Sequence, residues 1–175
     1  MSRVETIDTY FQELDAYPHI PFVPIATFVV DAATAIAVPG VGVPLICAVI
    51  EQESGGKLVF GCDAGGLYCH KMVTMSRLRR LLDHIQKGGT SQGVGLMQLT
   101  YGPFVTSWGM SLVQPRVQVF AGTSVLAPLI RDYDYMNALE AYNDGNPRFN
   151  DPTNPYELQV AAKHHAWKER LRGVA

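Results

Sequence analysis

The sequence predicts one mainly α-helical domain spanning residues 1–175, with a small β element near the middle of the chain. Three observations support this prediction. Apolar residues recur at helical spacing in seven segments, proline and glycine stand at the ends of these segments, and the glycine-rich stretches between Lys57 and Met110 have no helical period. With 175 residues, of which 47% are hydrophobic and 17% charged, the chain can bury a core of ordinary size.

These signals place the elements in chain order. The stretch Pro18–Pro24 should be an extended link, and Pro44 suits the first turn of the third helix, which should end at Gly55. Small residues and alternating glycines make Thr90–Thr100 a short irregular strand or tongue. The predicted helices are Val4–Tyr17, Ile25–Val38, Leu45–Glu53, Met75–Lys87, Pro115–Ile130, Tyr135–Tyr142 and Tyr156–Leu171.

The charge balance narrows the classes of partner. Fourteen Lys and Arg face 16 Asp and Glu, a net charge of −2, which argues against a nucleic-acid binder. The uncharged run Ala32–Ile50 approaches the length of a membrane span. However, Pro39–Pro44 breaks it into two short helices, so no stable membrane insertion is expected. The polar, acidic stretch Met1–Asp15 does not have the pattern of a signal peptide.

The three cysteines leave two possibilities open. Cys62 and Cys69 can close a short loop while Cys47 remains free, or all three can remain reduced. Zinc at Cys62, Cys69 and His70 is disfavoured, because the paired spacing of structural zinc sites is absent.

The first candidate for chemistry lies at the end of the third helix, in the segment ICAVIEQESGG. Glu51 and Glu53 are about 200° apart around a helix, so we expect one to be solvated and the other to face inward. Glu53 lies at the helix C-terminus beside apolar residues, and both features should raise its pKa. A glutamate that stays protonated near neutral pH can act as a general acid. A solvated glutamate without a special role is the alternative reading.

Two further segments contain residues typical of binding sites. In QGVGLMQL, Gly93 and Gly95 allow a close approach to the backbone, and Gln98 offers a donor and an acceptor. In ALEAYNDG, Tyr142 and Asn143 stand at a helix end beside a glycine. Each segment alone also fits an ordinary turn or helix cap.

Taken together, the three segments resemble the soluble lytic transglycosylases and the goose-type lysozymes. Those families carry E-S-G, then G-x-G-L-M-Q, then A-Y-N-x-G. This chain has Glu53–Gly55, Gly93–Gln98 and Ala141–Gly145 in the same order. The resemblance implies a lysozyme-like fold whose β-tongue borders a substrate cleft, with residues 1–43 as a helical extension and residues 44–175 as the motif-bearing core. It also implies cleavage of the β-1,4 bond between N-acetylmuramic acid and N-acetylglucosamine.

The resemblance assigns roles residue by residue. Glu53 matches the catalytic acid, Gln98 a residue that hydrogen-bonds the substrate, and Tyr142 an aromatic that hydrogen-bonds Glu53 or the acetamido group. The residues expected to bind substrate are Ser54, Gly95, Met97, Gln98, Tyr142 and Asn143. No metal or organic cofactor is implied, and the partner would be a peptidoglycan glycan strand met by a monomer. Without a signal peptide, the expected setting is a phage endolysin or virion-associated lysin, or a bacterial enzyme lacking its leader.

The second carboxylate is the main departure from the family pattern. Thr100 stands where goose-type enzymes have an aspartate, and no acidic residue directly precedes Gly93. We therefore expect a lytic transglycosylase with Glu53 as the sole acid and base. The alternatives are a hydrolase whose base is Asp63, Asp83 or Asp144, and a wall-binding or phage structural module without activity.

Overall fold

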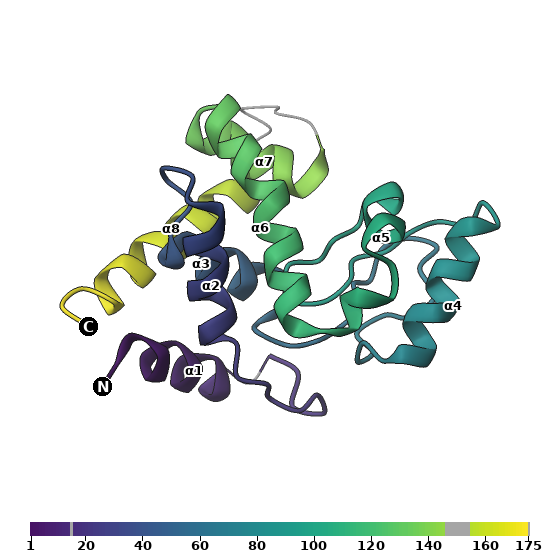
Figure 1. Cartoon of the computed structure of the whole chain (residues 1–175), viewed down its shortest axis with the longest axis horizontal. Coiled ribbons are helices and arrows are strands. Elements are labelled where there is room, and N and C mark those ends of the chain that lie inside the picture. Colours follow the sequence, from purple (N-terminus) through teal and green to yellow (C-terminus); the bar gives the residue numbers. More distant parts are fainter. Residues whose placement is uncertain (15, 146–154, 175) are drawn as a thin grey trace.

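The computed structural model describes residues 1–14, 16–145 and 155–174, and this part of the chain is mainly helical (Figure 1). The predicted α class is thus confirmed. The elements are α1 (Arg3–Glu13), α2 (Ala26–Ile36), α3 (Val43–Ser54), α4 (Met75–Gln86), α5 (Gly102–Trp108), the 3-10 helix η1 (Gly109–Val113), α6 (Pro115–Asp132), α7 (Tyr135–Asp144) and α8 (Tyr156–Arg170).

The expected β-tongue is not confirmed. Among the described residues no sheet forms; instead, three isolated antiparallel bridges join Val59 to Met72, Phe60 to Val94, and Val94 to Leu99. The segment around Val94 is therefore an irregular loop tied to its neighbours by a few backbone hydrogen bonds. None of the described helices is both long and apolar enough to span a membrane.

Local signals account for most helix ends. Ser2 and Glu5 form a capping box at the start of α1. Pro44 lies in the first turn of α3, and Gly55 ends that helix in the left-handed conformation (φ 58°). The first helix ends at Glu13, four residues before the predicted boundary. Leu14 caps it in an extended conformation, so the chain turns across the end of α3 earlier than expected.

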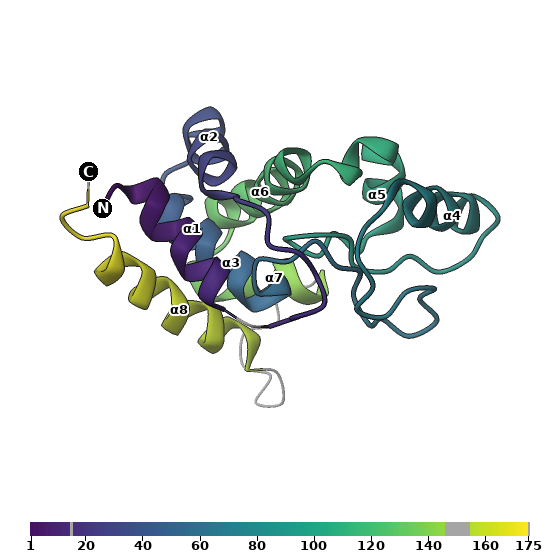
Figure 2. The ribbon, with the colours of Figure 1, turned by 90° about the horizontal axis from the view of Figure 1, so that it is seen from below.

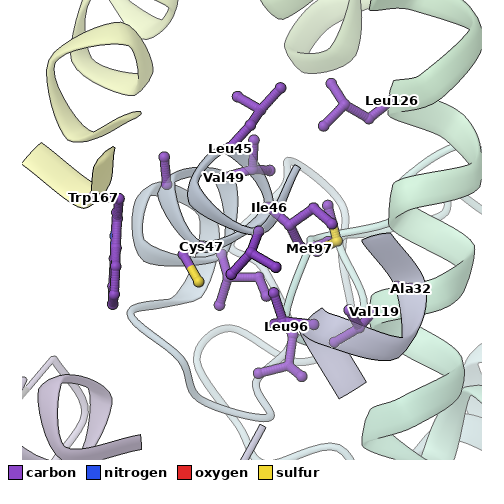
Figure 3. Packing of buried hydrophobic residues seen from close by; sticks show 14 of the residues in the cluster. Ala32, Leu45, Ile46, Cys47, Val49, Leu96, Met97, Val119, Leu126 and Trp167 are labelled. Atoms are coloured by element: carbon purple, nitrogen blue, oxygen red, sulfur yellow. The ribbon is translucent and has the colours of Figure 1, made fainter. Parts of the chain in front are cut away.

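The main hydrophobic core surrounds α3. From Leu45 to Ile50 every side chain of this helix is fully buried, and the helix packs against α2 and α8. Figure 3 shows Ile46 and Val49 of α3 among Leu96, Met97 and Val119, with Trp167 of α8 on the opposite side. In Figure 2 α8 runs alongside α3, and the two termini lie at the same end of the molecule. The helix that carries Glu53 is thus the most deeply buried element.

A second, smaller core lies at the other end of the molecule. It joins α4, α5 and η1 to Phe60, Val94 and Leu99. Figure 1 shows α4 and α5 at one end, α1, α3 and α8 at the other, and the long helix α6 between them. Helix α6 contributes Val119 and Leu126 to the first core and Ala121 to the second. It therefore connects two lobes, and the segment 93–98 lies where they meet.

Two short helices were missed from the sequence. We predicted β structure or irregular chain up to Met110, but α5 and η1 occupy 102–113. The Gly102–Pro103 pair indicates a turn in the sequence, yet Pro103 lies in the first turn of α5, where its missing N–H costs nothing. The pair α5 and η1 is short and gains its stability by packing against α4.

Candidate functional site

The site is centred on Glu53, in the last turn of α3. Its Oε1 accepts a hydrogen bond of 2.5 Å from the hydroxyl of Tyr156, the first residue of α8. Burial raises the pKa of Glu53 to about 7. The hydrogen bond from Tyr156 acts in the opposite direction, and the negative charge of Asp63 raises the pKa further. The upward direction predicted from the sequence is confirmed, with burial as its main cause.

Glu51 has a different environment from Glu53. We expected one of the two to be solvated, but both side chains are partly buried. Glu51 accepts a hydrogen bond of 2.9 Å from Nε1 of Trp167 and another from Tyr10. It therefore links α3 to α8 and α1, which leaves Glu53 as the carboxyl of this pair available for chemistry.

The glycine motif forms a packed turn beside the end of α3. Gly95 has φ 77°, and a Cβ there would collide with Oε1 of Gln118. Only glycine lets Gln118 reach the backbone, where its Oε1 accepts from Leu96 N at 2.9 Å and its Nε2 donates to Leu112 O. Met97 is fully buried and packs against Gly122. Gly95 and Met97 thus shape the turn rather than line an open surface.

Two side chains hold this turn in place from either side. Ser54 is buried, and its hydroxyl donates to Leu96 O at 2.8 Å, so it ties α3 to the motif. Gln98 has a positive φ of 47° and donates from Nε2 to Gly95 O at 2.7 Å and to Val59 O at 3.0 Å. Its Oε1 lies beside Gly61 and Gly93. The amide nitrogen of Gln98 and the hydroxyl of Ser54 therefore both serve to fix this turn.

Helix α7 contributes an aromatic residue to the same turn. The Tyr142 hydroxyl donates to Met97 O at 2.7 Å, not to Glu53 as one alternative expected. Asn143 is exposed near the end of the helix. The tyrosine that contacts Glu53 is Tyr156, which sequence reasoning missed. Its only signal was an aromatic residue at the start of the closing helix.

A second acidic residue approaches from the loop after Phe60. Cys62 and Cys69 form a disulfide, and Asp63 lies inside the loop that it closes. Of the two possibilities that the sequence left open, a disulfide or three reduced thiols, the structure has the disulfide. Oδ2 of Asp63 accepts from Gly93 N at 2.7 Å and lies next to Oε1 of Gln98 beside Gly61. Asp63 is thus the candidate base whose charge reaches Glu53. Asp83 is exposed on α4, and Asp144 is exposed at the end of α7.

The buried Gln92 fixes this loop. Its Nε2 donates to Gly61 O and Tyr68 O, and its Oε1 accepts from Tyr68 N. The cysteine sulfurs and the His70 ring lie within 4.8 Å of one another. Because the disulfide uses both thiols, only one ligand remains there for a metal.

A groove of about 660 Å³ opens beside Glu53. It is lined by the end of α3, by α8, by the loop after Cys69 and by the chain that follows α1. Lining residues include Leu14, Tyr17, Gln52, Glu53, His70 and Lys163. The carboxyl with the raised pKa therefore faces a space large enough for part of a polymeric ligand.

Comparisons with known proteins add no relative. No protein-family model, curated protein or solved structure matches the chain. Functional inference therefore depends on the site geometry and on the motifs.

Proposed function

We propose that the chain is a peptidoglycan-degrading enzyme that cleaves the β-1,4 bond between N-acetylmuramic acid and N-acetylglucosamine, with Glu53 as its acid and base. The observation that carries this proposal is a glutamate with a pKa of about 7 that opens into a groove. The G-x-G-L-M-Q and A-Y-N-x-G motifs pack together beside the end of α3 through Ser54 and Tyr142. In a lysozyme-like enzyme of this kind, α3 would be the helix that carries the catalytic acid, and the turn 93–98 would border the substrate cleft.

The reaction proposed first is that of a lytic transglycosylase. Glu53, protonated, donates its proton to the glycosidic oxygen; the bond from C1 to that oxygen breaks while the 2-acetamido oxygen of the muramic acid residue bonds to C1 from the other face, and the N-acetylglucosamine residue leaves with its new hydroxyl. The resulting carboxylate then takes the proton of the C6 hydroxyl as O6 attacks C1 and the bond between C1 and the acetamido oxygen breaks, which closes a 1,6-anhydro ring and restores the acetamido group. One group serves as acid and then as base, so a pKa near 7 suits both steps. General acid–base catalysis of this kind contributes roughly 10²–10⁴ in rate.

The position of Asp63 supports a second candidate, a hydrolase on the same bond. Its charge acts on Glu53, and its carboxylate is held by Gly93 N. An inverting hydrolase uses such a second carboxylate, roughly 6.5–9.5 Å from the acid, to activate water. The products separate the two candidates, because the hydrolase leaves reducing ends and the transglycosylase leaves anhydro ends.

The test of catalysis is release of soluble fragments from dye-labelled peptidoglycan. The wild type should release dye, and Glu53→Gln should not. Glu13→Gln, on the exposed surface of α1, is the matched control and should behave as the wild type. Equal release by Glu53→Gln would overturn the assignment of Glu53. No release by any of the three proteins would favour the non-catalytic wall-binding module.

A further inference from the structure

The groove beside Glu53 has walls that the three motifs do not supply. Tyr17 comes from the link after α1, His70 from the chain just past the disulfide, and Lys163 from α8. Nε2 of His19 lies 3.3 Å from His70 O, and the rings of Tyr17 and His70 are 5.0 Å apart. The chain after α1 and the disulfide loop are therefore in contact and together line one part of this groove, while α8 lines another part.

Lys163 is the main positive charge in this groove. Its Nζ donates to Gln52 Oε1 at 2.8 Å, which uses one of three donors. Across the described residues, none of the ion pairs involves Lys163. Gln52 in turn donates to Gln159 Oε1 at 2.7 Å, so the amide is oriented to accept from Lys163. The ammonium group is held in place, with two donors available to a ligand.

Among the described residues, neither carboxylate that lines this groove forms an ion pair with Lys163. Glu51 lines the same groove, but its Oε2 accepts from Trp167. Glu53 has a pKa of about 7, so it is about half protonated at neutral pH and fully protonated when it acts as an acid. An ammonium group that is held by a neutral amide and paired with neither of these carboxylates can bind an anionic ligand.

We propose that this groove binds the peptide stem of peptidoglycan, and that Lys163 pairs with a stem carboxylate. This inference rests on the function proposed above. In peptide-bearing strands the lactyl carboxyl is bound in an amide, so the sugars are uncharged and the carboxylates lie on the stem peptide. An amidase that removes the stem leaves a lactyl carboxylate at the sugar but takes away the carboxylates of the peptide. The stem leaves the lactyl group of the muramic acid residue next to the bond that would be cleaved, so it begins within reach of Glu53. The side chain of Gln52 and the wall at Tyr17 and His70 would flank an extended peptide.

The experiment compares one glycan with and without its peptides. Purified peptidoglycan and the same strands stripped by an amidase are digested by the wild type, Lys163→Met and Lys163→Arg. Lys168→Met, exposed on the same helix and outside this groove, is the matched control. Thermal melting of each variant shows whether it folds.

The expected result is that Lys163→Met lowers kcat/KM on peptide-bearing strands about tenfold, the equivalent of about 1.4 kcal/mol. On stripped strands it should match the wild type, and Lys163→Arg should recover most of the lost rate. An equal loss on both substrates would overturn the proposal, because it would indicate a structural role or a sugar subsite. Unchanged rates on both would overturn it as well. If the wild type cleaves neither substrate, the proposed function itself fails, a distinct outcome.

A binding measurement gives an independent readout. Glu53→Gln should bind N-acetylmuramyl-L-alanyl-D-glutamate more tightly than the diamide of the same compound, in which both glutamate carboxyls are uncharged, and adding Lys163→Met should remove the difference. Equal affinity for the two probes in Glu53→Gln would contradict recognition of the stem.

Discussion

The hydroxyl of Tyr156 donates to Oε1 of Glu53 at 2.5 Å and so joins the first turn of α8 to the last turn of α3. This contact stabilises the charged carboxylate, while burial and the charge of Asp63 stabilise the protonated form. The resulting pKa of about 7 is a balance among these influences. A substitution can remove each influence separately. Whether that influence raises or lowers the pKa of Glu53 then predicts the direction in which this pKa moves.

Removing the Tyr156 hydroxyl should raise the pKa of Glu53. Tyr156→Phe deletes the donor that favours the carboxylate. A hydrogen bond to a charged group is worth about 1.5–3 kcal/mol, so the basic limb of the pH profile of kcat/KM should move up by about one to two pH units. Tyr142→Phe is the matched control: it loses the bond to Met97 O and about 1–3 kcal/mol of stability. A basic limb that stays in place in Tyr156→Phe would contradict this description of Glu53.

Removing the Asp63 charge should have the opposite effect. Asp63→Asn keeps an acceptor for Gly93 N but no longer raises the pKa of Glu53, so the basic limb should move to lower pH. Asp83→Asn, on the exposed face of α4, should leave the profile unchanged. Loss of nearly all activity in Asp63→Asn, without a change in fold, would instead favour the hydrolase with Asp63 as its base.

The raised pKa of Glu53 should make the native state less stable above neutral pH. Because the folded state holds this proton up to about pH 7 and the unfolded state only to about pH 4.5, stability falls as pH rises between these values. Glu53→Gln removes this loss. It should be more stable than the wild type by about 3 kcal/mol at pH 8, at 1.36 kcal/mol per pKa unit, and similar to it at pH 4. Urea denaturation at both pH values measures this, with Glu13→Gln as control. Equal stability at pH 8 would show that Glu53 ionises freely.

The disulfide should contribute to stability through loop closure. Cys62 and Cys69 are seven positions apart, and closing so short a loop is worth about 2.5 kcal/mol in the chain-entropy model. Both cysteines are exposed, so a thiol reductant should lower the urea midpoint accordingly. Cys62→Ser/Cys69→Ser should start at this lower midpoint and not respond to reductant, since Cys47 is buried and unpaired. If reductant left the urea midpoint of the wild type unchanged, this would contradict a contribution of the disulfide to stability.

The sequence predicted the fold best in segments where a helix forms from its own local signals. The sequence placed α3, α4, α6, α7 and α8 to within a few residues, because each is an apolar run or has apolar residues at helical spacing, with a proline or glycine near an end. It did worse between Lys57 and Met110, where chain segments are stabilised by partners far away. The turn at Gly95 depends on Gln118, and α5 depends on α4. No local pattern reveals such pairings.

The candidate site also has some features that depend on sequence neighbours and others that depend on distant parts of the chain. The position of Glu53 at a helix end and the direction of its pKa shift could be predicted, because both depend on neighbours in sequence. Tyr156 and Asp63 could not be assigned to Glu53, since α8 and the disulfide loop reach it only in the folded chain. The roles predicted for Ser54 and Met97 followed from motif positions, which carry no information on burial, and both side chains are buried.

The most direct test of the central claim is mass spectrometry of soluble muropeptides released from purified peptidoglycan. The account predicts products with 1,6-anhydro ends, lighter by one water than hydrolysis products, from the wild type, and no products from a folded Glu53→Gln variant. Reducing ends would contradict the transglycosylase reaction and favour hydrolysis with Asp63 as base. Products from Glu53→Gln equal to those of the wild type would contradict the assignment of Glu53 as the acid.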